Sequence, residues 1–494
     1  MRAARKALQQ ARGKQKLDLI LDSADPGRLV RALPAEELYF TLLDVGPDDA
    51  AALVAMATPE QFRHFVDMSA WGAADEPPRM REVLHWLRLA REGGDTARFR
   101  RQLAALDVEL LALLFRRELS IHDLDEDNPP QPSQPGMAYY TPDRRFLLEF
   151  TGGAEFASLR QLLDDLYAED AFRAGQLIEA ARWEQPTELE ELARRWREGR
   201  LRDAGVPQLD EALAFYARRA APAQETAAST GTALAVKQRP LLEAALELLS
   251  GEELEQAEES AVYAANAALV ANRAPLTDAD EVRATLADAR ATLSLGLELL
   301  SGGDAARAAR LLVEKPVREL FQTGMSEAYR LQTRARKIAA AARLPQAQSA
   351  TVLDEPLESA LQALLSLRPQ LREPGQRRPR AFGSRADVAL ASSLLDEAEA
   401  MLALLGAHGI PPSVLGPKAE EAGLGPAAVK ASGAIWALIE SQLNGRDFSL
   451  HGLAEEVRQK SPGFDQQLHD LVRNGVQNET GGIILDRLKK ALNR

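Results

Sequence analysis

The densest run of potential metal ligands is His122 to Asn128, where aspartates alternate at Asp123, Asp125 and Asp127. Carboxylates at alternate positions are typical of a calcium loop, which also needs a glycine at its sharp turn and a bidentate glutamate at its end. Here the glycine is absent and Gln134 stands in the place of the glutamate. The three aspartates are candidate metal ligands, but the sequence favours a solvated acidic loop.

Other residue types that often do chemistry are not arranged for it. The six histidines are scattered, and no two stand four residues apart, the spacing that puts two zinc ligands on one helix face. We expect His64 and His85, which lie in apolar helical segments, to pack between helices. The sequence has no Gly-x-Ser-x-Gly, Gly-x-x-x-x-Gly-Lys or Gly-x-Gly-x-x-Gly, and no cysteine. We therefore predict no catalytic residue, no cofactor and no resident metal.

Two groups of basic residues could contact an anionic partner. They form an N-terminal arm and an arginine-rich linker, made of Arg2, Arg5, Lys6, Arg12, Lys14 and Lys16, and of Arg368, Arg372, Arg377, Arg378, Arg380 and Arg385. Neither group is interleaved with aromatic residues that could stack on bases, and the formal net charge of -13 repels nucleic acid. Electrostatic nucleic-acid binding through the arm or the linker is thus kept only as an alternative, and Arg377, Arg378 and Arg380 are our candidates for contact with a partner.

Composition predicts a folded protein of the cytosol. Of the 494 residues, 46% are hydrophobic and 27% are charged, which is the balance of a globular protein. Such a length suits about two to four compact units or one elongated helical array. The basic N-terminus lacks the apolar stretch of about 7–15 residues that a signal peptide needs, and no run of about 18 apolar residues could span a membrane. Because disulfides are also excluded, we expect a cytoplasmic location.

Prolines punctuate the first part of the chain where helices should start. Pro26, Pro34, Pro47 and Pro59 suit a first helical position, because the N–H that proline lacks has no partner there, and carboxylates follow the last three. Apolar residues recur every three or four positions between these prolines, which predicts short helices. Helices of about ten residues cannot bury an apolar face alone, so we predict that residues 1–128 stack into a superhelix.

The next unit, residues 129–222, contains the only convincing β signal. Met137–Tyr140 and Phe146–Phe150 flank a turn and predict one β-hairpin, which should pack on neighbouring helices. In the helical part of this unit we interpret Leu189, Leu192 and Trp196 as packing residues of an amphipathic helix.

Two further helical units complete the predicted fold. Residues 233–367 are rich in alanine with a clean apolar stripe, which predicts a bundle of long helices, and residues 386–494 form a C-terminal helical unit. The arginine-rich segment between them reads as a loop or linker. The fold class is therefore mainly α: a superhelix of stacked short helices, then helical bundle units, with one small hairpin.

Several segments resemble known families. Lys16–Trp71, the run Trp196–Leu201 and the hairpin residues Phe146–Phe150 are similar to an uncharacterised bacterial family that carries only a domain-of-unknown-function label. This resemblance implies no activity. Leu33–Leu38 and Gly46–Ala50 are also similar to the cytosolic superhelical domain of MgtE-type magnesium transporters, which would imply a magnesium-sensing role, although this chain has no channel.

Stacked helices present long ridges and grooves, a shape that favours peptide or protein ligands. We therefore expect a non-enzymatic interaction or scaffold protein whose N-terminal superhelix binds a protein partner. The alternative is an enzyme, or a regulator that responds to a nucleotide or metal, with a cryptic site between the hairpin and the bundle.

Overall fold

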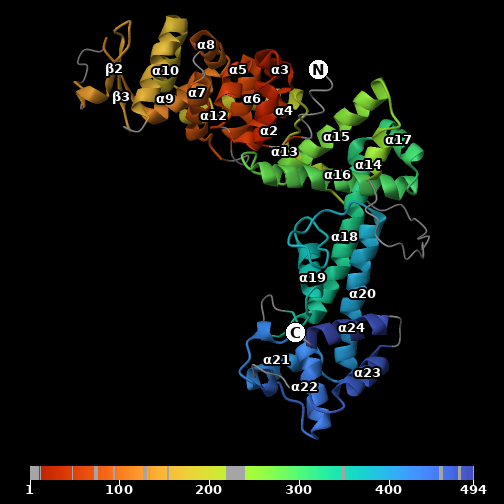
Figure 1. Ribbon diagram of the computed structural model, residues 1–494. Helices are drawn as coiled ribbons and strands as arrows, with labels where there is room; N and C mark the ends of the chain where they lie inside the picture. The colour runs from red at the N-terminus through yellow and green to blue at the C-terminus, as the bar shows by residue number, and fades with distance from the viewer. Residues whose placement is uncertain are drawn as a thin grey trace. The chain divides into compact units, whose positions relative to one another are not determined.

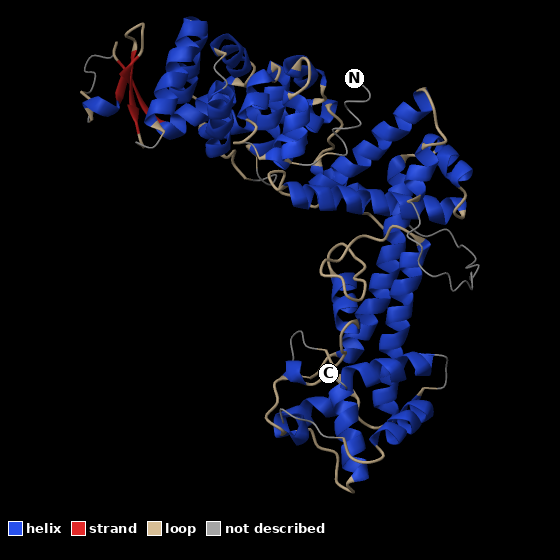
Figure 2. Ribbon diagram, viewed as in Figure 1, coloured by secondary structure: helices blue, strands red, loops and turns tan. Residues whose placement is uncertain are grey.

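The computed structural model describes residues 11, 13–46, 48–71, 76–92, 95–125, 131–132, 134–152, 155–218, 240–345, 351–454, 460–476 and 480–492. Their fold is mainly α, as predicted, with a small antiparallel sheet (Figures 1 and 2). Contacts divide the chain into unit 1, Met1–Ala212 with Asn266–Thr285, and unit 2, Leu213–Ala265 with Leu286–Arg494. The finer division into four units stays a prediction.

Short helices make up most of unit 1. They are α2 (Lys14–Leu21), α3 (Pro26–Ala32), α4 (Ala35–Val45), α5 (Ala51–Met56), α6 (Pro59–Ser69), α7 (Met80–Glu92), α8 (Thr96–Ala104), α9 (Val108–Glu118), α10 (Phe156–Glu169), α11 (Ala171–Trp183) and α12 (Pro186–Asp203). Each helix from α2 to α6 contacts the helix two places further along the chain, as stacked short helices do. The residues of α13 (Leu209–Phe215), α15 (Glu252–Ala271) and α16 (Ala279–Ser301) are divided between the two units.

The helix starts that prolines predict are confirmed wherever the structure describes them. Pro26 and Pro59 occupy the first turns of α3 and α6, and Pro34 directly precedes α4. Pro47 lies outside the described residues. Thr58 caps α6 through a reciprocal pair of hydrogen bonds, because its hydroxyl accepts from the Gln61 N–H at 3.1 Å and its own N–H donates to the Gln61 side chain at 2.8 Å.

Two buried glutamines close the ends of earlier helices. Gln61 on α6 donates from Nε2 to the carbonyl groups of Val30 and Leu33 at the end of α3, at 3.0 and 2.8 Å. Gln102 on α8 does the same at the end of α5, where its Nε2 lies 3.1 Å from the Val54 oxygen and 2.9 Å from the Ala57 oxygen. Carbonyl groups at a helix end have no partner within the helix, so these amides supply donors that buried ends require.

The sheet has three strands, not the two of the predicted hairpin. Strands β2 (Ala138–Tyr140) and β3 (Phe146–Phe150) form that hairpin, and β1 (Leu119–Asp123) pairs antiparallel with the other edge of β3, in the order β1-β3-β2 (Figure 2). Strand β1 includes His122 and Asp123, for which the sequence favours an acidic loop, and that expectation is wrong for these two residues. Phe146, Leu148 and Phe150 join the main apolar core of unit 1.

Longer helices and a C-terminal group of helices make up unit 2. They are α14 (Leu241–Leu246), α17 (Ala305–Glu314), α18 (Val317–Ala342), α19 (Leu357–Leu365), α20 (Arg385–Ala407), α21 (Pro412–Glu421), α22 (Ala431–Leu443), α23 (Phe464–Gly475) and α24 (Thr480–Leu492). Within this unit α16 and α18 cross with their backbones in contact. A Cβ placed on Gly296 would overlap the Leu320 carbonyl, and one on Gly324 would overlap that of Thr292.

The arginine-rich segment before α20 is an ordered loop within unit 2. Leu371 and Arg380 exchange backbone hydrogen bonds of 2.7 and 3.0 Å, and the chain reverses at Gly375, whose φ is +87°. Asp288 on α16 holds the base of the loop, because its carboxylate accepts from the Ala381 N–H at 2.7 Å and from Gln370 Nε2 at 3.0 Å.

Candidate partner-binding face

Helix α12 is anchored in unit 1 by the charged residues of its inner side. The Arg200 guanidinium donates to both Asp67 oxygens on α6, at 2.8 and 2.9 Å, and to both oxygens of Asp107, at 2.9 and 2.6 Å. Burial lowers the pKa of Arg200, but these hydrogen bonds outweigh burial and raise it, so the side chain stays charged. Four charge-assisted hydrogen bonds therefore fix the rotation of α12 about its axis.

The outer side of α12 presents apolar side chains to solvent. Leu192 and Trp196 lie one turn apart and are 37% and 53% exposed. Gly199 continues the same stripe, and in the described part of the chain no atom other than the backbone of α12 itself lies within 4 Å of the position that its Cβ would take. The Trp196 indole is oriented by α9, since its Nε1 donates to Glu109 Oε1 at 3.3 Å.

The prediction that Leu192 and Trp196 pack in the core was wrong. Leu189, which the sequence also assigns to the packed side, is buried, and Ala193 and Leu201 complete the buried side of α12. Helical periodicity identifies two apolar stripes on α12 but does not show which stripe the rest of the protein covers.

Helix α11 carries two more exposed aromatic side chains. Phe172 is 76% exposed and Trp183 is 68% exposed. Eleven residues separate them, so they lie on one face of α11, about 16 Å apart along its axis. The Arg182 guanidinium lies 4.4 Å from the centre of the Trp183 ring and forms an ion pair with Asp123 at 3.2 Å.

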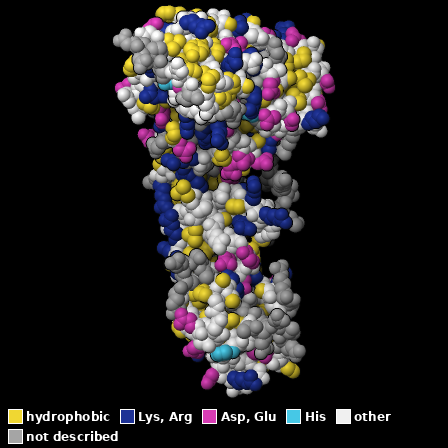
Figure 3. All heavy atoms as spheres, turned by 90° about the vertical axis from the view of Figure 1, so that its left-hand side faces the viewer, with side chains coloured by type: hydrophobic (Ala, Val, Ile, Leu, Met, Phe, Trp, Pro, Cys, Tyr) yellow, Lys and Arg dark blue, Asp and Glu magenta, His cyan; other side chains and the backbone are white. Residues whose placement is uncertain are grey.

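We name Phe172, Trp183, Leu192 and Trp196 the aromatic face. Both of its helices pack on α9. An aromatic side chain buries about 150–250 Å² when fully covered, so covering the exposed parts of these three aromatic residues would remove roughly 300–500 Å² from water. At about 25 cal/mol/Å² this is worth on the order of 7–12 kcal/mol before the costs of association. The sheet end of unit 1 faces the viewer in Figure 3, where hydrophobic side chains gather in several groups.

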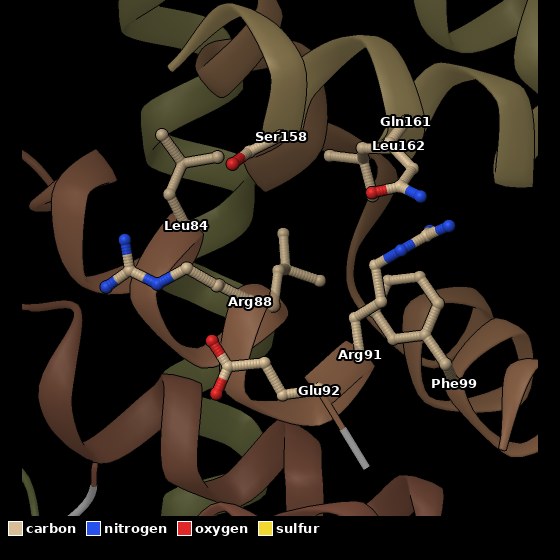
Figure 4. Close-up of a pocket in the computed structure, with 9 residues that line it drawn as sticks. Leu84, Arg88, Arg91, Glu92, Phe99, Ser158, Gln161 and Leu162 are labelled. Atoms are coloured by element: carbon tan, nitrogen blue, oxygen red, sulfur yellow. The ribbon is translucent and has the colours of Figure 1, made fainter. Parts of the chain in front are cut away.

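A small groove lies between α7, α8 and α10 in unit 1. Its volume is about 290 Å³, and it is lined by Leu84, Leu87, Arg88, Arg91, Glu92, Phe99, Ser158, Gln161 and Leu162 (Figure 4). Arg91 forms an ion pair with the buried Asp165, and Arg100 approaches the same carboxylate at 3.5 Å. The apolar lining residues are already buried, so a ligand would gain little by covering them. The groove is also at the lower limit of small-molecule pockets, which span about 300–1,000 Å³.

The candidate metal ligands do not converge in the described part of the chain. Asp123 is engaged by Arg182 and by the Asp125 N–H, which donates to Asp123 Oδ1 at 3.0 Å. Asp127 lies outside the described residues. Among the residues that the structure does describe, no three His, Asp or Glu side chains are grouped to hold a metal ion.

The arginine candidates in unit 2 have different environments. Arg377 and Arg378 are exposed near the tip of the ordered loop. Arg380 instead bridges two carboxylates, with Nη2 2.5 Å from Glu373 Oε1 and 2.7 Å from Asp387 Oδ1. In the N-terminal arm, Lys16 forms an ion pair with Asp44 at 3.3 Å, and residues 1–10 and Arg12 lie outside the described residues.

Unit 1 consists mainly of short helices, and two of them, α11 and α12, expose aromatic side chains to solvent. The chain is thus a mainly α protein whose candidate binding site is the aromatic face. The family model described as "Family of unknown function (DUF6178)" matches residues 1–476, so the chain belongs to that family, which confirms the predicted membership of a domain-of-unknown-function family. No curated protein and no solved structure matches the chain. None of the described helices is long and apolar enough to cross a lipid bilayer.

Proposed function

We propose that this chain is a non-enzymatic interaction protein of the cytosol that binds a protein partner through the aromatic face. The observation that carries this proposal is the exposure of Phe172, Trp183 and Trp196, each more than half accessible to water on anchored helices. Tryptophan is one of the residue types enriched among the few side chains that supply most of the binding energy at protein interfaces. Exposed apolar side chains that gather on one surface mark sites of protein interaction.

The partner we propose is an amphipathic helix of another protein. Phe172 and Trp183 mark a straight line of about 16 Å along α11, and a helix of about three turns presents apolar side chains over the same length. Because Arg200 fixes α12, the aromatic face needs little ordering on binding, which lowers the entropic cost of association.

The test uses the full chain as bait in an extract of its native host. The variant Phe172→Ala/Trp183→Ala/Trp196→Ala is compared with the wild type and with Leu367→Ala, which removes an 84% exposed leucine from unit 2. Circular dichroism establishes that all three proteins keep their helix content. We expect a partner that the wild type and Leu367→Ala capture and the triple variant loses.

A direct binding measurement then tests whether the aromatic face is the site that binds this partner. The helical segment of that partner is titrated against each protein, and we expect the triple variant to bind at least about tenfold more weakly, the change that 1.4 kcal/mol produces. If the triple variant captures the same proteins with the same affinities as the wild type, the aromatic face is not the binding site.

Point variants are preferable to deletion of the N-terminal helices. Removal of residues 1–128 would take β1 away from β3 and the core of unit 1 with it, so loss of binding would report unfolding.

A further inference from the structure

Three segments of unit 2 bring arginine side chains together on the surface of α18. The chain just beyond α13 contributes Arg218, whose guanidinium lies 5.1 Å from the centre of the Tyr329 ring on α18. One turn further along α18, Gln332 Nε2 donates to the Ser366 oxygen at 2.7 Å and so holds the loop that follows α19. The Gln332 oxygen in turn accepts from Arg336 Nη2 at 3.0 Å. These contacts place Arg336 beside the loop and Arg218 beside Tyr329.

The third arginine comes from the loop itself. Arg368, two residues after Ser366, lies with its guanidinium 3.5 Å from the centre of the Tyr216 ring, and Tyr216 is two residues before Arg218. An arginine stacked on an aromatic ring keeps the N–H groups of its planar edge available for a carboxylate. We name Arg218, Arg336 and Arg368 the basic patch.

The basic patch carries more positive charge than the fold neutralises. From Tyr329 to Arg343 the chain has five arginine and lysine residues and no carboxylate. Arg330 and Arg334 on this helix are paired with carboxylates, Arg330 with Glu327 at 2.7 Å. Like charges one turn apart disfavour a helix, so a helix selected for stability alone would mix both signs.

Two arginines of the basic patch lack such pairing. Arg218 and Arg336 are exposed, and neither forms an ion pair with a carboxylate of the described residues. The formal net charge of the chain is -13, so these cations stand out against an acidic protein. A partner that supplies carboxylates would complete the arrangement.

We propose that the basic patch binds a short acidic segment of another protein, whose aspartate or glutamate side chains accept from the three guanidinium groups. Bidentate pairs of arginine with carboxylate are among the stronger charged hydrogen bonds. This surface lies in unit 2, and its proposal does not depend on partner binding by the aromatic face.

The tyrosine rings favour a peptide over a single-stranded nucleic acid. Tyr216 is only 9% exposed and packs on Phe321 with the ring centres 5.2 Å apart, and Tyr329 is half-buried beside Arg218. Bases stack on exposed aromatic faces, and these two rings are already in use within the protein. The basic patch therefore offers charge without a stacking platform.

The size of the basic patch sets the length of the acidic segment. Tyr329 and Arg336 are seven residues apart on α18, which corresponds to about 10 Å along the helix axis. An extended peptide covers this distance with about three or four residues. A run of about six acidic residues is therefore long enough to reach all three arginines.

Fluorescence anisotropy with the full chain tests the proposal. The probe is a fluorescein-labelled peptide of about six glutamates, compared with a glutamine peptide and a thymidine oligonucleotide of the same length. We expect the glutamate peptide to bind at least about tenfold more tightly than either comparison probe. Its binding should also weaken as NaCl rises from about 0.05 M to about 0.5 M, because salt screens exposed charges.

Variants locate the site on the chain. Arg218→Gln/Arg336→Gln should raise the Kd of the glutamate peptide at least about fivefold, because both unpaired guanidinium groups are lost. The matched control is Arg307→Gln/Arg310→Gln, which removes the same charge from exposed positions of α17 in the same unit and should change the Kd less than about twofold. Circular dichroism establishes that both variants keep the helix content of the wild type.

Three results would overturn the proposal. The first is a wild type that does not distinguish the glutamate peptide from the glutamine peptide. The second is tighter binding of the oligonucleotide than of the glutamate peptide, which would make the basic patch a nucleic-acid site. The third is an equal loss of affinity in both variants, which would mean that the peptide responds to overall charge and not to this surface.

Discussion

Replacing Gly296 with alanine sets two physical effects of opposite sign against each other. Alanine is favoured over glycine in a helix by about 1 kcal/mol, so propensity alone predicts that Gly296→Ala stabilises α16. At this position, however, the new Cβ would overlap the backbone carbonyl of Leu320 on α18. A backbone atom cannot move aside as a flexible side chain can, so the two helices would have to separate.

Separation affects the apolar cluster at the crossing. Leu293, Leu297 and Leu320 are fully or almost fully buried there. A gap of about 0.5–1 Å forfeits about a quarter to a half of each dispersion contact, and overpacking in cores costs about 1–3 kcal/mol. Because the overlap is with a backbone atom, we place the cost at the upper end of that range, about 3 kcal/mol, and after subtraction of the gain in propensity we expect a net loss of about 2 kcal/mol in the free energy of unfolding.

Urea unfolding followed by circular dichroism at the helix band measures this change. The matched control is Gly406→Ala in α20 of the same unit, which should be neutral or slightly stabilising. Among the described residues, no atom other than the backbone of α20 itself lies within 4 Å of the new Cβ. The reasoning is refuted if Gly296→Ala is as stable as the wild type or more stable, because propensity would then outweigh the steric overlap.

Two further perturbations test other parts of unit 1. Gln102→Leu should lower the free energy of unfolding by about 2 kcal/mol, because two buried carbonyl groups at the end of α5 lose their donor, whereas the exposed Gln176→Leu should leave it unchanged in the same urea titration. The pKa of His64 falls from its ordinary value of 6.5 to about 4 on folding, so below pH 6.5 the unfolded chain binds a proton that the folded chain does not. Stability should therefore decline as the pH falls from 6.5 to 4, by about 2 kcal/mol at pH 5 from this group. His64→Gln should flatten that part of the stability profile, and an unchanged profile would contradict the assignment.

The parts of the fold that the sequence predicted are those that local chemistry determines. The helix starts at Pro26, Pro34 and Pro59 follow from residues within one turn, and the hairpin of β2 and β3 follows from two apolar runs around a turn. Strand β1 was missed because it pairs with a distant part of the chain, as in the Ile121 and Leu148 pair, and no local pattern reports such a partner.

The candidate site was predicted less well for the same reason. An exposed tryptophan and a buried one have the same helical spacing, so Trp196 was assigned to the core. Composition revealed the arginine-rich loop, but only the positions of Glu373 and Asp387 show that Arg380 is engaged while Arg377 and Arg378 face solvent.

The glutamine caps of unit 1 imply an order in which this unit folds while it is being synthesised. The end of α3 is closed by Gln61, which lies 28 and 31 residues after the two carbonyl groups it serves, and the end of α5 is closed by Gln102, 45 and 48 residues after its own pair. When α3 or α5 has emerged from the ribosome, the carbonyl groups at its end therefore lack their glutamine donor until that later residue has also emerged. Unit 1 should thus fold in steps from its N-terminus. Each step can be completed only after the glutamine that caps the helix end, Gln61 or Gln102, has been translated.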